Sequence, residues 1–255
     1  MAGPVSRSRN RLLSALSSED FQHLAPQLTP VDLEKGRLLY DPGDSITTVY
    51  FPTEGVVSLL TLMESGEAIE SATIGREGAL GLQASIGPRE SLSRAIIQVP
   101  GKALRVSATI LQDLWRRSPS FRDLVDRHNE AVYGHAIQSV ACNALHSVEA
   151  RFCRWLLTCH DRISGDTVAL TQEFLADMLG VQRTTVTAVA RSLQEKGVIR
   201  YRRGVVDIID RQGLQALTCE CYGVIRKTYQ RLLGPAGMAT DHDRAERSAR
   251  YGSAG

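Results

Sequence analysis

The chain has 255 residues, of which 43% are hydrophobic and 23% are charged. This composition excludes a wholly disordered or collagen-like chain, and the length is enough for two modest domains. Lys and Arg (30) nearly balance Asp and Glu (28), so the overall charge does not by itself indicate a nucleic-acid partner. No apolar run reaches the roughly 18 residues of a membrane-spanning helix, and the N-terminus lacks the apolar core of a secretory signal. We therefore expect a cytoplasmic protein without a membrane partner.

A β-rich segment is predicted over residues 19–117, after an N-terminal arm over residues 1–18. Glycines recur through this segment and separate short runs of β-forming residues. Short strands with turn signals about every ten residues are typical of a sandwich or barrel. The runs are Thr48–Phe51, Val56–Met63, Ala68–Ile74 and Ala95–Val99.

From Ser118 onwards the pattern becomes helical. Ser118 as N-cap and Pro119 in the first turn predict a helix start, and the helix is expected to run to about Ala144. At about 1.5 Å per residue it would span roughly 40 Å, more than one small β domain can cover. We therefore predict that residues 118–146 form a dimerisation helix, whose apolar stripe meets a second copy of the chain. The stripe consists of Tyr133, Ile137, Val140, Ala144 and Val148.

A helix-turn-helix motif is predicted after a further helix over Val148–His160. Thr171 is the expected N-cap of its first helix, Gly180 supplies the turn, and the second helix runs from Arg183 to Lys196. The small Ala176, four residues before Gly180, allows the two helices to pack closely. This spacing is typical of a motif that places its second helix in the DNA major groove. Two ordinary core helices joined by a glycine are the alternative.

Two β-type runs on either side of Arg203-Gly204 predict a hairpin with a basic tip. Its arginines would contact phosphates and so position the protein on DNA. The winged helix-turn-helix domain is thus expected over residues 147–214, and a C-terminal helix with a disordered tail over 215–255. Arg183 is expected to bond guanine O6 and N7. The candidate DNA-binding residues are Thr171, Gln172, Gln182, Arg183, Thr184, Thr187, Arg191, Arg202 and Arg203.

These motifs resemble the Crp/Fnr family of bacterial transcription regulators almost end to end. The front half is similar to the family's cyclic-nucleotide-binding-type β-roll at Pro42-Gly43-Asp44, Val49-Tyr50-Phe51 and Gly78-Ala79-Leu80-Gly81, and residues 171–199 match its DNA-binding motif. The resemblance implies an α+β fold with an N-terminal antiparallel, jelly-roll-like β-roll, a long dimerisation helix and a C-terminal winged helix-turn-helix. It also implies a homodimer that binds an inverted repeat in double-stranded DNA under the control of an effector, with RNA polymerase as a further partner.

The sequence does not identify the effector. Family members that bind cyclic AMP carry a glutamate for the ribose and an Arg-Ser pair for the phosphate, whereas here Ala79 stands at the glutamate position and the order is Ser93-Arg94. A buried hydroxyl left without its acceptor costs about 1–3 kcal/mol, which argues against cyclic AMP. A cyclic-nucleotide-binding regulatory protein is kept as an alternative. The candidate effector-binding residues are Gly78, Ala79, Leu80, Ser93 and Arg94.

No cofactor or metal site is predicted. No cysteine precedes Cys142, which argues against an iron–sulfur cluster. His128, His135 and Cys142 recur every seven residues and so share a helix face; we expect them at the dimer seam or on the surface, with a haem or metal sensor as the alternative. Cys219-Glu220-Cys221 lacks a second ligand pair at zinc spacing and is taken as incidental, with a redox role as the alternative. No phosphate loop or nucleophile elbow is found, so we expect no enzyme.

Overall fold

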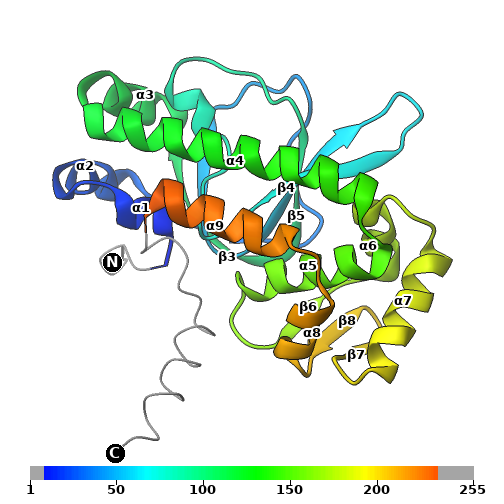
Figure 1. The fold of residues 1–255 in the computed structure, drawn as a ribbon. Coiled ribbons are helices and arrows are strands. Elements are labelled where there is room, and N and C mark those ends of the chain that lie inside the picture. The colour runs from blue at the N-terminus through cyan, green and yellow to red at the C-terminus, as the bar shows by residue number, and fades with distance from the viewer. Residues whose placement is uncertain (1–8, 235–255) are drawn as a thin grey trace, which may run out of the picture.

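The computed structural model describes residues 9–234, and the tail predicted to be disordered from Pro235 lies outside this range. The chain forms a β-rich domain, a long helix across its face and a smaller helical domain with a three-stranded sheet (Figure 1). Within the described residues, no helix is both long and apolar enough to cross a bilayer.

The predicted N-terminal arm packs onto the β-rich domain. It contains α1 (Arg11–Ala15) and the start of α2 (Ser18–Leu24), which is followed by a short 3-10 helix, η1 (Ala25–Gln27). Leu12 and Leu13 are buried in the main hydrophobic core. The side chain of Asn10 caps α1 and also donates to the backbone oxygens of Pro52 and Gly78, at 2.8 and 2.9 Å.

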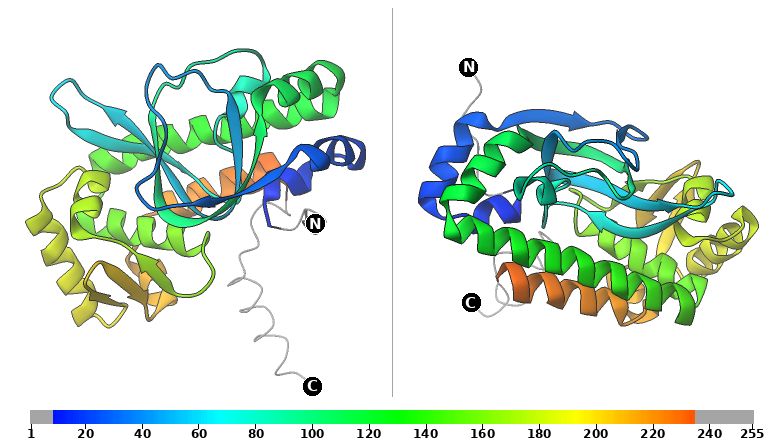
Figure 2. Two further views of the ribbon diagram at one scale, coloured as in Figure 1. Left: turned by 180° about the vertical axis from the view of Figure 1, so that it is seen from behind. Right: turned by 90° about the horizontal axis from the view of Figure 1, so that it is seen from above.

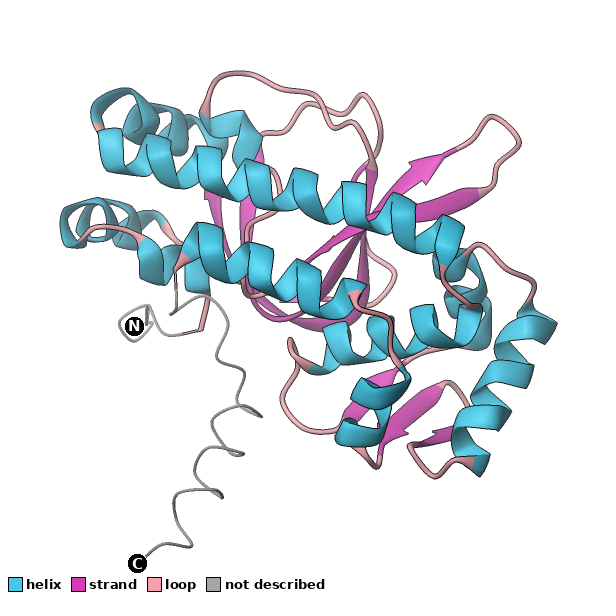
Figure 3. Ribbon diagram, in the orientation of Figure 1, coloured by secondary structure: helices cyan, strands magenta, loops and turns pink. Residues whose placement is uncertain are grey.

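The β-roll is built from five antiparallel strands that lie behind the long helix in Figure 3. The strand order is β1-β5-β3-β4, and β2 pairs with β5 outside this path. The strands are β1 (Thr29–Leu33), β2 (Leu38–Tyr40), β3 (Thr48–Leu62), β4 (Ala68–Ile74) and β5 (Arg94–Ser107), and a 3-10 helix, η2 (Leu82–Ser85), lies between β4 and β5.

Two of the predicted strands form a single long strand in the structure. Thr48–Phe51 and all of Val56–Met63 except Met63 belong to β3, which bends through register shifts between Pro52 and Val57. Gly55 lies in this bend with φ +93°, and a Cβ there would come within 2.6 Å of the Val99 carbonyl oxygen. The glycine therefore permits a bulge between paired strands, not the turn that its presence indicated.

The helical part begins earlier than predicted. Residues of α3 (Ala108–Arg117) are already helical, and Ser107 caps this helix. Ser118 then caps α4 (Pro119–Leu145) by accepting from the Phe121 backbone N–H at 3.1 Å, and Pro119 occupies the first turn. The predicted start and end of the long helix are thus confirmed.

α4 has a buried face and an exposed face. Its buried face covers the β-roll and α9 (Cys221–Leu233), which runs beside α4 (Figure 2). His128, His135 and Cys142 lie on the buried face, with 2%, 2% and 0% exposure, so their predicted position at the dimer seam or on the surface is wrong.

The predicted apolar stripe lies on the exposed face of α4. Tyr133, Ile137 and Val140 are 68%, 52% and 71% exposed in the single chain. Val148 does not extend the stripe, because α4 ends at Leu145 and Val148 begins the next helix.

The C-terminal domain surrounds a second hydrophobic core. Buried residues of five helices meet there, and Val56 and Val99 of the β-roll join them, so the two domains are packed together. The three strands pair in the order β6-β8-β7. The elements are α5 (Val148–His160), β6 (Thr167–Ala169), α6 (Gln172–Leu179), α7 (Arg183–Glu195), β7 (Ile199–Arg202), β8 (Val205–Ile208) and α8 (Arg211–Leu217).

Candidate DNA-binding interface and effector cavity

The turn between α6 and α7 has the geometry that the sequence predicts. Thr171 caps α6 by accepting from the Phe174 backbone N–H at 3.3 Å. The helix ends at Gly180, whose φ of +60° is left-handed and therefore suits glycine. The Val181 N–H then donates to the Ala176 oxygen at 3.0 Å. Only the three residues 180–182 separate α6 from α7.

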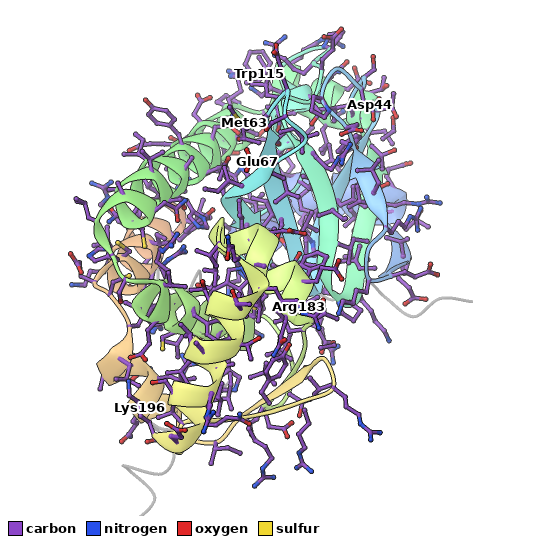
Figure 4. All side chains as sticks on the ribbon, turned by 90° about the vertical axis from the view of Figure 1, so that its right-hand side faces the viewer. Asp44, Met63, Glu67, Trp115, Arg183 and Lys196 are labelled. Carbon is purple, nitrogen blue, oxygen red and sulfur yellow. The ribbon has the colours of Figure 1, made fainter. Side chains whose placement is uncertain are left out.

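α7 turns an apolar face inward and a polar face outward. Val186, Ala190 and Leu193 are buried in the second core. Gln182 is the N-cap but makes no side-chain capping bond, so backbone N–H groups of the first turn have no side-chain cap and suit an anion. Figure 4 shows Arg183 and Lys196 towards opposite ends of this helix. The candidate residues Gln182, Arg183, Thr184, Thr187 and Arg191 are all exposed.

The predicted hairpin is the wing formed by β7 and β8. Its two-residue tip is Arg203-Gly204, with φ of +46° and +81°, as in the type I′ turns that suit twisted hairpins. Within residues 9–234, Arg203 is the one non-glycine residue at positive φ. Arg202 and Arg203 are both exposed.

A cleft of about 460 Å³ brings three elements of this domain together. It lies between the start of α6, the start of α7 and the wing, and Thr187 Oγ1 donates to Gln172 Oε1 at 3.1 Å nearby. Arg191 lies further along α7, where its guanidinium pairs with Glu195 at 3.0 Å. The residues that line the cleft are Thr171, Gln172, Glu173, Arg183, Tyr201, Arg203 and Gly204.

Tyr201 and Glu173 were not among the residues predicted for this surface. The Tyr201 hydroxyl donates to the Leu170 oxygen at 3.1 Å, and its backbone N–H donates to Gln194 Oε1 at 2.8 Å. The sequence places Tyr201 in the first β-type run of the hairpin. That its ring lines the cleft follows only from the packing of the wing against Leu170.

A second cavity, of about 390 Å³, lies between the β-roll and α4. Of the candidate effector-binding residues, Ala79, Leu80 and Ser93 line it, whereas Gly78 and Arg94 do not. The Arg94 guanidinium donates to both carboxylate oxygens of Asp41, at 2.8 Å each. It is therefore held by a partner outside the cavity.

α4 supplies part of the cavity wall, which the sequence did not indicate. His128, Asn129, Val132, Tyr133 and Ala136 all line it. Nε2 of His128 accepts from the Ala79 N–H at 3.1 Å, and a Cβ at Gly78 would lie 2.7 Å from the same nitrogen. Burial lowers the pKa of His128 to about 4, so the imidazole is neutral at physiological pH.

The cavity lining is mainly apolar, and its polar groups are uncharged at neutral pH. Thr61, Ser71, Gln83, Ser91 and Ser93 contribute hydroxyl or amide groups. Among the described residues that line it, there is no Arg, Lys, Asp or Glu.

Comparison with known proteins identifies both domains. Residues 30–118 match the model of the cyclic nucleotide-binding domain, and residues 150–217 match that of the Crp-like helix-turn-helix domain. Together they take in more than half of the chain. A global nitrogen regulator of Nostoc sp. is 23% identical over 185 residues, which cover 69% of this chain and 82% of that protein.

Solved structures share the fold. FixK2 from Bradyrhizobium japonicum superposes with a TM-score of 0.64 at 18% identity, over 75% of this chain and 98% of that one. TTHA1359, a Crp/Fnr-family transcriptional regulator from Thermus thermophilus, gives a TM-score of 0.57 at 21% identity, over 74% and 97%. The Nostoc and Thermus proteins are both regulators.

A β-roll joined through a long helix to an exposed helix-turn-helix with a basic wing defines a two-domain transcription regulator. This chain belongs to the Crp/Fnr family of transcription regulators. The α+β fold and the predicted role as a transcription regulator are thereby confirmed, and the effector is unspecified.

Proposed function

We propose that the protein works as a homodimer that binds an inverted-repeat operator through two copies of α7 and responds to a small molecule in the cavity between the β-roll and α4. The observation that carries this proposal is the polar, solvent-facing start of α7 beside the basic wing. Arg183 is assigned to a guanine edge, and Arg202 and Arg203 to phosphates.

The exposed stripe on α4 supports the dimer. Tyr133, Ile137 and Val140 are large apolar residues on successive turns and are more than half exposed in the single chain. Such continuous apolar surface indicates a protein–protein contact. A second copy on this face would place two α7 helices on one side of the assembly, as an inverted repeat requires.

The lining of the cavity favours an uncharged or weakly polar effector. A cyclic nucleotide carries a phosphate, for which the lining offers no cation, because Arg94 is paired with Asp41. Hydroxyl and amide groups from both the β-roll and α4 would contact the bound molecule. An effector held between these elements would bias the position of α4 by binding one arrangement more tightly than another. RNA polymerase as a further partner stays a prediction.

Selection of bound duplexes from random DNA by the purified full-length protein tests the proposal. We expect an inverted repeat whose half-site centres are separated by about 34 Å, one turn of DNA. A duplex with one half-site scrambled is the matched control and should bind much more weakly. A recovered motif without twofold symmetry, or no enrichment at low ionic strength, would contradict the proposal.

The effector is sought separately, by native mass spectrometry of the gently purified protein. Cyclic AMP and cyclic GMP should leave the melting temperature unchanged. A saturable increase with either nucleotide would instead favour the alternative, a cyclic-nucleotide-binding regulatory protein.

A further inference from the structure

Four potential metal ligands gather where α4 ends. Within residues 9–234, Cys142, His146, Cys219 and Cys221 form one group in which all the ligand atoms lie within 4.8 Å of one another. Cys142 lies in the last turn of α4 and His146 is its C-cap residue. Cys219 lies between α8 and α9, and Cys221 begins α9.

Two distances between these atoms match the edges of a tetrahedron around one ion. Zn–S bonds of about 2.3 Å and Zn–N bonds of about 2.0–2.1 Å require S···S edges of about 3.8 Å and S···N edges of about 3.6 Å. The Sγ atoms of Cys142 and Cys219 are 3.6 Å apart, and Cys221 Sγ lies 3.5 Å from Nδ1 of His146. A sulfur separation of 3.6 Å is far longer than the roughly 2.05 Å of a disulfide. All five cysteines of the chain are free thiols.

The histidine is oriented from outside the cluster. Its Nδ1 faces Cys221, while its Nε2 lies 3.1 Å from Oε2 of Glu220. A metal-binding histidine commonly donates its second ring N–H to a carboxylate in this way. This bond fixes the orientation of the ring and leaves the other nitrogen unprotonated for the metal. The Gln138 amide donates to Cys221 Sγ at 3.0 Å, so a second side chain outside the cluster holds a ligand in place.

The surroundings suit a negatively charged thiolate site. Cys142 and Cys221 are fully buried and Cys219 is 7% exposed, which restricts exchange with water. The guanidinium groups of Arg151 and Arg154, both on α5, interact electrostatically with Cys142. Three thiolates around a divalent ion leave one net negative charge, which these arginines offset.

We infer that Cys142, His146, Cys219 and Cys221 bind one zinc ion in a closed Cys3His site. Three sulfurs and one imidazole in tetrahedral positions select zinc over hard cations such as magnesium, which prefer oxygen ligands. With all four positions filled by the protein, the ion has a structural role. It ties the end of α4, where the chain turns towards the DNA-binding domain, to the helix that follows that domain.

Metal analysis and cobalt substitution of the full-length protein test this inference. We expect one zinc per chain after purification without chelator. Cobalt added to the metal-free protein should give the thiolate charge-transfer and intense visible bands of tetrahedral Co²⁺. Cys142→Ala and Cys219→Ala should abolish these bands. Cys153→Ala and Cys159→Ala are matched controls, because these buried cysteines of α5 lie outside the group, and they should retain the metal.

Glu220→Gln provides a variant that is expected to fold, since the Glu220 side chain is 71% exposed. Replacing the carboxylate that accepts from His146 by a neutral amide should weaken zinc affinity about 10–100-fold in competition with a chromophoric chelator. Absence of zinc, equal cobalt spectra for the wild type and Cys142→Ala, or a Cys142–Cys219 disulfide in protein alkylated at lysis would each overturn the inference.

Discussion

The guanidinium group of Arg162 and the carboxylate of Glu77 form an ion pair between the two domains, with Nη2 2.6 Å from Oε1. Both side chains are 6% exposed, and Nη1 of Arg162 also donates to Thr73 Oγ1 at 2.5 Å. Burial by itself would raise the pKa of Glu77, but the adjacent Arg162 charge holds that pKa below its ordinary value. Gly75 makes this approach possible, because a Cβ there would overlap with Cδ of Arg162.

Replacing Glu77 by Gln should strongly destabilise the protein. Removing one partner leaves the other charge buried and uncompensated, which costs about 3–5 kcal/mol. Urea unfolding at neutral pH measures the free energy of unfolding. Asp41→Asn is the control, because it breaks the more exposed pair with Arg94, and its unfolding midpoint should stay close to that of the wild type. Equal midpoints for Glu77→Gln and the wild type would contradict the prediction.

Arg183→Ala should lower specific operator affinity and relax the preference at one base pair. A bidentate contact with guanine contributes about 1–3 kcal/mol of discrimination. Fluorescence anisotropy with the operator, a single-base variant and random DNA measures the change. Lys196→Ala removes a charge from the opposite end of α7, where Lys196 pairs with Glu149, and should have little effect. Equal losses on operator and random DNA would make Arg183 a phosphate contact instead.

Arg203→Asn should weaken binding to all DNA sequences alike. The variant removes the charge but keeps a residue that tolerates the left-handed backbone at φ +46°, so the wing should fold. Because the arginine no longer neutralises a phosphate, the slope of log affinity against log salt should decrease in magnitude by about 0.9 per phosphate. Arg116→Gln, an exposed arginine on α3, is the control. An unchanged slope would remove Arg203 from the interface.

His128 should make the protein less stable as the pH falls. Its pKa is about 4 in the folded state, because the ring is buried, against about 6.5 when unfolded. The unfolded state therefore binds more protons between these values, and stability is complete above pH 6.5 and decreases towards pH 4, by up to about 1.4 kcal/mol per pH unit.

His128→Gln isolates this effect, because glutamine accepts a hydrogen bond but does not titrate. Its urea midpoint should fall less steeply than that of the wild type between pH 6.5 and 4. The exposed His23 is the control, and His23→Gln should follow the wild type. Parallel pH profiles for all three proteins would contradict the assignment.

Ile137→Glu and Val140→Glu should convert the proposed dimer to a monomer. Each places a charge in the exposed stripe of α4, where a second copy would bury it. Sedimentation velocity at micromolar concentration measures the assembly state. Ile209→Glu is a matched control, because Ile209 is 53% exposed outside this helix. A wild-type monomer, or a variant that stays dimeric, would contradict the proposed interface.

Features with local causes could be predicted from the sequence. The cap at Ser118, the turn at Gly180 and the hairpin at Arg203-Gly204 depend on residues within a few positions of one another. The start of α3 had a comparable signal, because Ser107 is a capping serine before a helix-forming run. This helix was missed because residues 19–117 were assigned as one β-rich segment.

Features created by distant contacts could not be predicted. Cys142 and Cys219 are 77 residues apart, and only the antiparallel packing of α4 against α9 brings them together. The contact between His128 and Ala79 likewise depends on how α4 crosses the β-roll. Arg94 was predicted to bind the effector because an arginine can hold an anion. In the folded protein it pairs with Asp41 instead, and nothing in the sequence indicated this contact.

The segment from Gly75 to Leu80 contacts both halves of the molecule. At Glu77 it is fixed to Arg162 of the DNA-binding side, and two residues later Ala79 lines the cavity and bonds to His128. This short segment thus belongs at once to the wall of the ligand compartment and to the joint between the domains. We expect a molecule that displaces it on binding to alter operator affinity, and by thermodynamic reciprocity the operator would then alter affinity for that molecule by the same factor.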